Sequence, residues 1–323
     1  MDMTLDSLLF ASLQGIILLA LAPFTVGVLY WVKARLQRRQ GPSIWQPYRD
    51  LRKLLRQRPT APIGSSWVFE AAPVVAFACY GTLGFLAPLF LLSNVEGAPR
   101  TDDLLLIIAL LGLARLAVGL GGMAAGAPFG NLGSAREMFL HVLAEPILVL
   151  VTITLVLTWH TTNLALLLGR ESQSLAAVYR NPALLLLFPT LALTIVIEAG
   201  RLPFDNPGAH LELTMFGKAI HLEYAGAQLA LLEWAEWARL AFLFTLLINL
   251  LAPWSLATTQ QSGWLIVLAA VTYPVKLCLL AGAIAVWESV QIKIRLWALI
   301  PSAFVALAMA LLAVLLVVIQ QHI

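Results

Sequence analysis

The stretch Leu104-Leu-Leu-Ile-Ile-Ala-Leu-Leu-Gly-Leu-Ala-Arg-Leu-Ala-Val-Gly-Leu-Gly-Gly-Met123 decides the fold class, because it runs for 20 residues with a single charge, Arg115. A helix rises about 1.5 Å per residue, so about 20 apolar residues cross the roughly 30 Å of hydrocarbon in a bilayer. A strand of a membrane barrel would instead show about ten residues of alternating polarity. The stretch therefore predicts a transmembrane helix, which pairs its backbone polar groups within the segment.

Comparable apolar stretches recur along the whole chain. Of its 323 residues, 60% are hydrophobic and 11% are charged, whereas soluble domains carry about 25% charged residues. We therefore predict an all-α polytopic membrane protein with about eight transmembrane helices, built as a single integral membrane domain over residues 1–323. The expected spans are Leu8–Val32, Trp67–Leu92, Leu104–Met123, Phe139–Trp159, Ala183–Glu198, Leu232–Leu251, Trp264–Trp287 and Ile300–Ile319.

The distribution of basic residues predicts the orientation of these spans. Fourteen of the 20 Lys and Arg residues lie in the connections after the first, third, fifth and seventh spans, and nine of them lie between Lys33 and Arg58. Positively charged loops stay in the cytoplasm. We therefore expect long cytoplasmic loops after helices 1, 3 and 5, including a basic loop at 33–66 and an acidic loop at 199–231, with both termini outside.

The basic loop contains a candidate amphipathic helix from Tyr48 onward. One interpretation is a helix that lies on anionic lipid. The other is a surface that docks an acidic partner or lines a polar entrance, with Arg49, Asp50 and Lys53 as its candidate residues. The pattern consists of leucines on one face and basic residues away from it, at Leu51, Leu54 and Leu55 against Arg52, Lys53 and Arg56.

The connection between the third and fourth spans ends in the sequence Ser134-Ala-Arg-Glu137. Ser134 can cap the helix that follows, with Glu137 completing a capping box, so Glu137 has a structural interpretation. Glu145 lies about two turns farther into the apolar helix, with His141 four residues before it on the same face. That pair suits either a proton relay or mutual hydrogen bonding.

An acid-rich insert separates the fifth and sixth spans and begins Glu198-Ala-Gly-Arg-Leu-Pro-Phe-Asp205. A protein that needed only an anchor could use a short polar turn here, because the bilayer penalises charge. The insert is therefore the strongest candidate for a functional segment. Its four carboxylates are Glu198, Asp205, Glu212 and Glu223.

Further ionisable residues fall inside the predicted spans or at their ends. Each costs about 2.5 to 3.5 kcal/mol near mid-membrane, so the set needs pairing, hydration or neutralisation. We expect Glu236 to pair with Arg239 three residues away, and Lys276 to pair with a carboxylate on another helix. A row of such groups linked by water would also carry protons, and the sequence is compatible with both uses. The residues are Arg115, Glu233, Glu236, Arg239, Lys276 and Glu288.

The two cysteines, Cys79 and Cys278, lie in separate apolar spans with no second cysteine nearby. An iron-sulfur or zinc centre needs several closely spaced ligands. We predict no metal and no other cofactor on this chain.

Several motifs of the chain match one family over nearly its whole length. They are Arg35 with Arg38-Arg-Gln-Gly-Pro42, Gln46-Pro-Tyr-Arg-Asp-Leu-Arg-Lys-Leu54, Gly133-Ser-Ala-Arg-Glu137 with Glu145-Pro146, Glu198-Ala-Gly-Arg-Leu-Pro-Phe-Asp205, Glu212-Leu213 and Glu223-Tyr-Ala-Gly226. Together they resemble the membrane subunit shared by respiratory complex I (where it is known as Nuo-type H or 1) and the group 4 membrane-bound nickel-iron hydrogenases, including formate hydrogenlyase.

Two departures from the complex I pattern favour the formate hydrogenlyase and hydrogenase-4 branch. The loop passes directly from Gly41-Pro42 to Ile44-Trp-Gln46, where complex I usually has additional residues. Gly208 and His210 stand where complex I commonly has two further glutamates, which weakens the transfer of quinone chemistry to this chain and leaves Glu212 as the retained acid.

The resemblance implies a membrane junction subunit of a hydrogenase-type oxidoreductase, multi-pass in a bacterial or archaeal cytoplasmic (inner) membrane. Such a subunit anchors a peripheral electron-transfer arm and couples its redox reaction to proton or sodium translocation. The implied partners are a nickel-iron large subunit, an iron-sulfur small subunit, a ferredoxin-like subunit and antiporter-like membrane subunits. The nickel-iron centre and iron-sulfur clusters would lie on those partners, nucleic acid would not be bound, and this chain would have no complete active site.

The resemblance also assigns roles to residues, none of them catalytic. An ion-coupling relay would comprise Glu145, His141, Glu198, Asp205, Glu212, Glu223, Glu233, Glu236, Arg239 and Lys276. The interface and cavity lining would comprise Arg35, Arg49, Asp50, Lys53, Arg136, Glu137 and Arg201. The alternatives are a quinone-site subunit of respiratory complex I, an autonomous ion transporter, and a membrane anchor whose charges merely pair.

Overall fold

The computed structural model describes residues 5–92, 102–173, 181–201, 217–254, 256–258, 262–291 and 296–322, and these are almost entirely helical. Two short strands, β1 (Leu91–Leu92) and β2 (Ala257–Thr258), pair in parallel. The helices are α1 (Leu5–Leu36), α2 (Gln46–Leu55), α3 (Trp67–Leu86), α4 (Leu104–Ala124), α5 (Pro128–Trp159), α6 (Leu164–Gln173), α8 (Pro182–Glu198), α9 (Gly217–His221), α10 (Gly226–Leu251), α11 (Gly263–Val290) and α12 (Leu296–His322).

Every predicted span coincides with a helix, and the chain is an all-α membrane protein. Of the described helices, α1, α3, α4, α5, α11 and α12 are long and apolar enough to cross a membrane, and α8 is a shorter apolar helix of 17 residues. The 26-residue α10 carries three charges in its first half. A crossing by all eight helices, and their orientation, stay predictions.

Two of the predicted boundaries were wrong. The second span was extended to Leu92, but α3 ends at Leu86 and the chain turns into extended backbone at Ala87, just before Pro88. Pro88 biases the residue before it away from helix, which explains the stop. The fourth span was started at Phe139, but α5 begins at Pro128, whose fixed φ suits the first turn of a helix.

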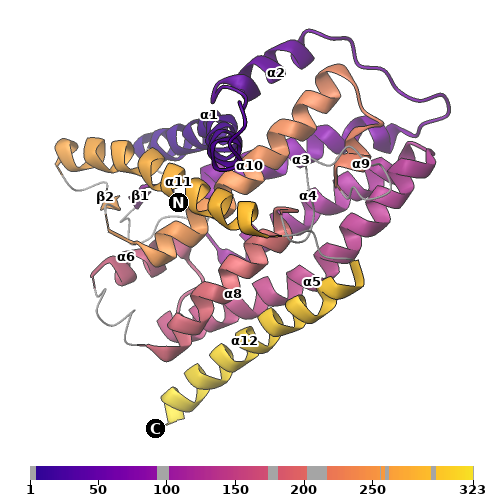
Figure 1. Cartoon of the computed structure of the whole chain (residues 1–323). Coiled ribbons are helices and arrows are strands. Elements are labelled where there is room, and N and C mark those ends of the chain that lie inside the picture. Colours follow the sequence, from indigo (N-terminus) through magenta and orange to yellow (C-terminus); the bar gives the residue numbers. More distant parts are fainter. Residues whose placement is uncertain are drawn as a thin grey trace.

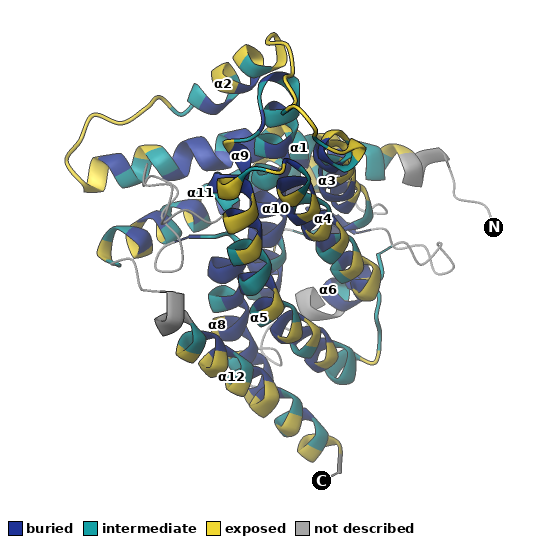
Figure 2. Ribbon diagram, turned by 90° about the vertical axis from the view of Figure 1, so that its right-hand side faces the viewer, coloured by how far each residue is buried: buried dark blue, intermediate teal, exposed yellow. Residues whose placement is uncertain are grey.

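Helix α10 lies in the middle of the bundle and contacts α1, α2, α3, α8 and α11 (Figure 1). Helix α12 lies at the edge of the molecule along α5 and α8, and many of its residues are exposed (Figure 2). Exposed apolar residues on the outside of such a bundle face lipid at no cost. The charged residues of α10 are therefore held in the most enclosed part of the protein.

Glycines on one face of α4 let α5 approach closely. A Cβ added at Gly112 would lie 3.3 Å from the Glu145 carboxylate, and Cβ atoms at Gly119 and Gly122 would clash with Met138 and Ser134. These three pairs give α4 and α5 an antiparallel register. They also place Ser134 inside α5 rather than at its start, so the predicted capping box of Ser134 and Glu137 is wrong.

A proline in the middle of α1 creates hydrogen-bonding sites for two other segments. Pro23 has no N–H, so the carbonyl of Leu19, four residues before it, lacks its helical donor. The indole Nε1 of Trp234 on α10 donates to that Leu19 oxygen at 2.9 Å. The hydroxyl of Tyr48 on α2 donates to the next carbonyl, that of Ala20. The break in α1 thus joins the basic loop and the central helix.

We expect the substitution Trp234→Phe to lower stability by about 1 to 3 kcal/mol, because it keeps the ring packed on Phe77 but leaves the Leu19 carbonyl without a donor. Thermal unfolding of the detergent-purified chain measures the change. Trp264→Phe on α11, at a side chain 72% exposed, is the matched control and should unfold like the parent. Equal melting temperatures for both variants would contradict the role of this hydrogen bond.

Candidate functional site

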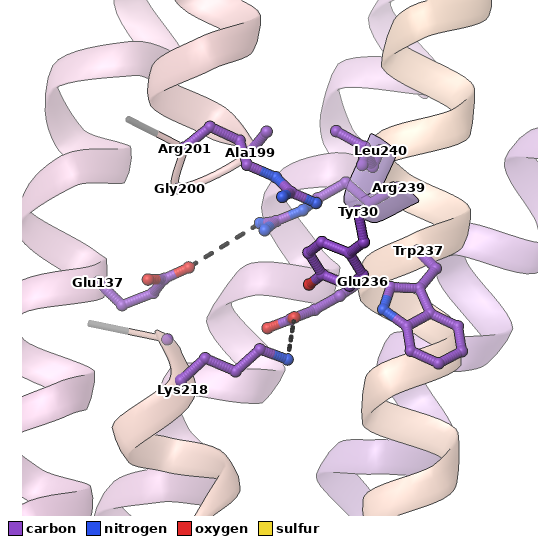
Figure 3. Close-up of a pocket in the computed structure, with 11 residues that line it drawn as sticks. Tyr30, Glu137, Ala199, Gly200, Arg201, Lys218, Glu236, Trp237, Arg239 and Leu240 are labelled. Carbon is purple, nitrogen blue, oxygen red and sulfur yellow. Dashed lines mark hydrogen bonds and ion pairs between the residues drawn. The ribbon is translucent and has the colours of Figure 1, made fainter. Parts of the chain in front are cut away.

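Charged side chains from α5, α9 and α10 converge beside the start of α10. Figure 3 shows Lys218 from α9 directed at Glu236, and the guanidinium of Arg239 directed at Glu137 on α5. Arg201, which follows α8, points toward the same space from above. The structure therefore brings together predicted relay residues that are about 100 positions apart in the sequence.

His221 lies between two carboxylates. Its Nδ1 is 3.0 Å from Glu233 and its Nε2 is 2.8 Å from Glu236. The Lys218 ammonium lies 2.7 Å from Glu233 and 3.1 Å from Glu236. Two cations therefore balance two carboxylates in a space from which most water is excluded, which is the arrangement that buried charges require.

This arrangement determines the charge of His221. Burial opposes the charged imidazole, and Lys218 repels it, but the carboxylates of Glu236 and Glu233 outweigh both and raise its pKa to about 9. The same two carboxylates outweigh burial at Lys218 and raise the pKa of its ammonium. Both groups carry a positive charge at neutral pH.

The ligand atoms of His221, Glu233 and Glu236 lie within 4.8 Å of one another, a spacing that would suit a metal ion. The Lys218 ammonium contacts both carboxylates of this group. A divalent ion would therefore have to displace Lys218 and the ring proton of His221. The geometry fits an internal ion cluster better than a metal site.

The second part of the network joins α5 to α10. Glu137 Oε1 lies 3.1 Å from His141 Nε2 and 3.9 Å from Arg239 NH1. Two predicted pairs are therefore wrong: Arg239 is directed at Glu137 and not at Glu236, and His141 contacts Glu137 one turn before it and not Glu145 one turn after it. Helical spacing allows either neighbour, and tertiary packing made the choice.

Two small cavities follow each other along this network. The first is lined by Tyr30, Arg201, Lys218 and neighbouring residues, and the second by Tyr80, Arg115, His141 and His221. Both include Glu137, Glu236 and Arg239 in their walls, so these three side chains separate the two spaces.

Arg115 and Glu198 form an ion pair in the interior. Arg115 on α4 is 4% exposed and Glu198, the last residue of α8, is 1% exposed. Glu145 lies half-buried near this pair, against Gly112 one turn away on α4. The short α8 ends on a buried charge because Arg115 provides the partner for it.

A third group of charges lies where α1 and α11 meet the segment after α8. The buried Glu288 carboxylate contacts Lys33 at 2.9 Å and Arg201 at 3.7 Å. The Arg201 guanidinium also lies over the ring of Tyr30, 5.6 Å from its centroid. Burial disfavours its charge, but Glu288 outweighs that effect and the pKa of Arg201 is raised.

Lys276 does not pair with a carboxylate among the described residues, which corrects the prediction. Its ammonium donates to the carbonyls of Ala252, at 2.8 Å, and Trp254, just past the end of α10, and lies 5.4 Å from the centre of the Trp254 ring. Carbonyls at a helix C-terminus lack helical donors and attract cations. Lys276 is therefore separated from the cluster around His221.

The motif Glu223-Tyr-Ala-Gly226 has a structural basis. The Tyr224 ring stacks on Phe69 at 4.1 Å, and its hydroxyl donates to the Phe69 carbonyl at 3.1 Å. Gly226 has φ +59° and touches the backbone of Arg58, where a Cβ would clash. The motif fixes the start of α10 against α3 and the end of the basic loop. Glu223 is half-buried beside Gly130.

The other predicted interface residues lie away from the cluster or outside the described part. Arg35, Arg49, Asp50 and Lys53 are exposed, and Arg136 is half-buried. Helix α2 buries Pro47 and Leu51 against the protein, so only part of its surface is free. Asp205 and Glu212 lie outside the described residues, as do Gly208 and His210.

Sequence reasoning missed three members of the network. Lys218 and His221 received no role, although their spacing of three residues on a short helix places them on one face. Tyr30 lies in an apolar span and gave no signal. Lys33 was counted only as a basic-loop charge, while the structure pairs it with Glu288.

A family described as "NADH dehydrogenase" matches residues 9–319. The chain belongs to this family. The membership agrees with the resemblance predicted from the motifs, and the family match covers almost the whole chain.

Two curated relatives are from Escherichia coli strain K12. Hydrogenase-4 component C is 32% identical over 265 residues, covering 82% of this chain and 81% of the relative. Formate hydrogenlyase subunit 4 is 30% identical over 319 residues, covering 95% of this chain and 100% of the relative. A membrane subunit of the NADH-quinone oxidoreductase of Syntrophotalea carbinolica is 30% identical, covering 76% of this chain and 78% of the relative.

The fold is also similar to a solved structure. A chain of the archaeal membrane-bound sulfane sulfur reductase, a respiratory membrane complex, superposes with a TM-score of 0.76 and 16% identity. The match covers 97% of this chain and 100% of that one. At this identity the likeness shows a shared fold.

The charge of His221 predicts how stability depends on pH. Its folded-state pKa of about 9 exceeds the ordinary 6.5. The stabilisation from its protonated ring is therefore complete below about pH 6.5 and is lost as pH rises through about 9. We expect the melting temperature to fall by several degrees over this interval, and His221→Gln to flatten the profile. His160→Asn at an exposed, left-handed position is the control, and an unchanged profile in His221→Gln would contradict the assignment.

Proposed function

We propose that this chain is the membrane junction subunit of a multi-subunit hydrogenase-type oxidoreductase. It would anchor the peripheral electron-transfer arm and couple the redox reaction to proton or sodium translocation. The observation that carries the proposal is the buried charge network of α5, α9 and α10, found in a chain that aligns over 82% and 95% of its length with hydrogenase-4 and formate hydrogenlyase subunits.

The partners would be a nickel-iron large subunit, an iron-sulfur small subunit, a ferredoxin-like subunit and antiporter-like membrane subunits. They would hold the nickel-iron centre and the clusters. The exposed basic residues of α2, Arg49 and Lys53, support docking of a peripheral subunit. A bacterial or archaeal cytoplasmic membrane is the compartment in which we expect this assembly.

The mechanism we propose is electrostatic. Two unit charges 4 Å apart interact by about 4 kcal/mol at an effective dielectric constant of 20, so a changed charge in the first cavity is felt in the second. Glu236 is suited to transmit the change because it contacts Lys218 on one side and His221 on the other and lines both cavities. A redox-linked shift of the acidic loop 199–231 would act first on Lys218 and Arg201.

A quinone-site subunit of respiratory complex I is the second candidate. The 30% identity to an NADH-quinone oxidoreductase membrane subunit over 76% of this chain favours it. The two candidates share the membrane scaffold and differ in the partners they bind, so isolation of the complex distinguishes them.

The test of the assembly is a mild-detergent pull-down of the tagged chain, with mass spectrometry of its partners and a hydrogenase assay on the eluate. We expect recovery of a nickel-iron large subunit with hydrogen activity. Nicotinamide-oxidising subunits with bound quinone would instead support the complex I alternative. A chain that stays alone would contradict both and support an autonomous transporter.

The test of the coupling is Glu236→Gln in the purified complex in proteoliposomes. We expect hydrogen turnover to persist and ion movement per hydrogen to fall to a small fraction of the parent, because the link between the two cavities loses its charge. Glu70→Gln, at an exposed carboxylate on α3, is the matched control. Full ion movement in Glu236→Gln would show that the network merely pairs charges.

A further inference from the structure

Arg115 lies at the inner end of the line of cavities. The first cavity is lined by Lys218 and Arg201, and the second by His141, Arg239 and Arg115. Glu145, on the other side of Arg115, is outside both cavities and lies against Gly112, one turn of α4 farther in. Any ion that passes from the cavities to Glu145 therefore meets Arg115.

The register of α4 and α5 explains this position. Gly112 faces Glu145 and Gly119 faces Met138, so the antiparallel pairing places Arg115, between these glycines, opposite His141. The Arg115 guanidinium is close enough to interact electrostatically with Glu137, Glu145 and Arg239. Its ion pair with Glu198 holds it at this level of the bundle.

Two guanidinium groups, Arg115 and Arg239, give this passage fixed positive charge. A guanidinium stays protonated in proteins and cannot be neutralised by losing a proton. A sodium ion in the second cavity would be repelled by both groups, in surroundings where charge is poorly screened. The nearby carboxylates, Glu137 and Glu236, already contact Arg239, His141 or the cations of α9, which reduces their attraction for a further ion.

A proton can pass the same point without a free cation. Glu137 Oε1 lies 3.1 Å from His141 Nε2, so a proton can leave the carboxyl oxygen as a bond forms to that nitrogen. The proton on His141 Nδ1 then leaves toward Glu145 through water, and the ring returns to its neutral form. His141 is 7% exposed, and its Nδ1 has no hydrogen-bond partner among the described residues, which leaves this atom available for such a transfer.

We propose that Arg115 is a charge barrier that makes the passage between the second cavity and Glu145 selective for protons over sodium ions. The proposal rests on the proposed function, and it specifies the coupled ion for this chain. Arg115 acts as a selectivity residue and does not itself carry the proton.

The experiment uses the assembled complex in proteoliposomes, with hydrogen turnover, a pH-sensitive dye and radioactive sodium measured together. We expect the parent to move protons with no sodium uptake. We expect Arg115→Gln to keep hydrogen turnover and raise sodium uptake about tenfold or more, because loss of a nearby unit charge changes the energy of the ion by at least about 1.4 kcal/mol. Arg115→Lys, which keeps the charge, should restore selectivity.

Arg115→Gln leaves the buried Glu198 without its partner and could fail to assemble. The double variant Arg115→Gln with Glu198→Gln removes both charges and should assemble while admitting sodium. Sodium uptake by the parent, or unchanged selectivity in an assembled variant that lacks the Arg115 charge, would overturn the barrier. A parent complex that turns over hydrogen but moves no ion would overturn the proposed function itself.

Discussion

The structure depends on the rule that a charge removed from water needs a partner of opposite sign. Glu198 is placed at the end of α8 with Arg115 as its partner, and Glu288 on α11 holds Lys33 of α1 and Arg201. An isolated charge in such surroundings costs several kcal/mol, whereas a paired and hydrogen-bonded one costs far less. The helices are therefore arranged so that each buried carboxylate in these groups meets a cation from another segment.

The same rule makes the cluster around His221 suitable for coupling. Its cations and carboxylates balance in number, so moving one proton or one side chain leaves an excess charge that neighbouring groups must answer. Glu236 contributes to the walls of both cavities and contacts Lys218 and His221, so it is placed to transmit such a change. A purely structural cluster would not need to line two neighbouring spaces.

Backbone features tie this cluster to the cytoplasmic loops that we predict. Pro23 frees carbonyls in α1 that accept hydrogen bonds from Trp234 of α10 and Tyr48 of α2. Gly226 allows the start of α10 to lie against Arg58 at the end of the basic loop. A displacement of the basic loop would therefore reach α10, on which Glu233 and Glu236 lie.

Much of the fold could be predicted from the sequence because apolar length is a local property. The run from Leu104 to Met123 must be helical if it lies in lipid, whatever its neighbours, and the motif around Glu198 was among those that indicated the family. The candidate site was only partly predictable. The relay residues Glu233, Glu236 and Arg239 were identified as charges that need partners, while Lys218 and His221, which supply two of those partners, were missed.

The sequence by itself determined which residues are apolar enough to form helices and which charges require compensation. Only the tertiary structure decided the partners: His141 contacts Glu137 rather than Glu145, Arg239 contacts Glu137 rather than Glu236, and Lys276 binds carbonyls at the end of α10. Helical spacing offers each side chain several neighbours of similar energy. The packing of other helices, set by glycines such as Gly112, decides which neighbour is reached in three dimensions.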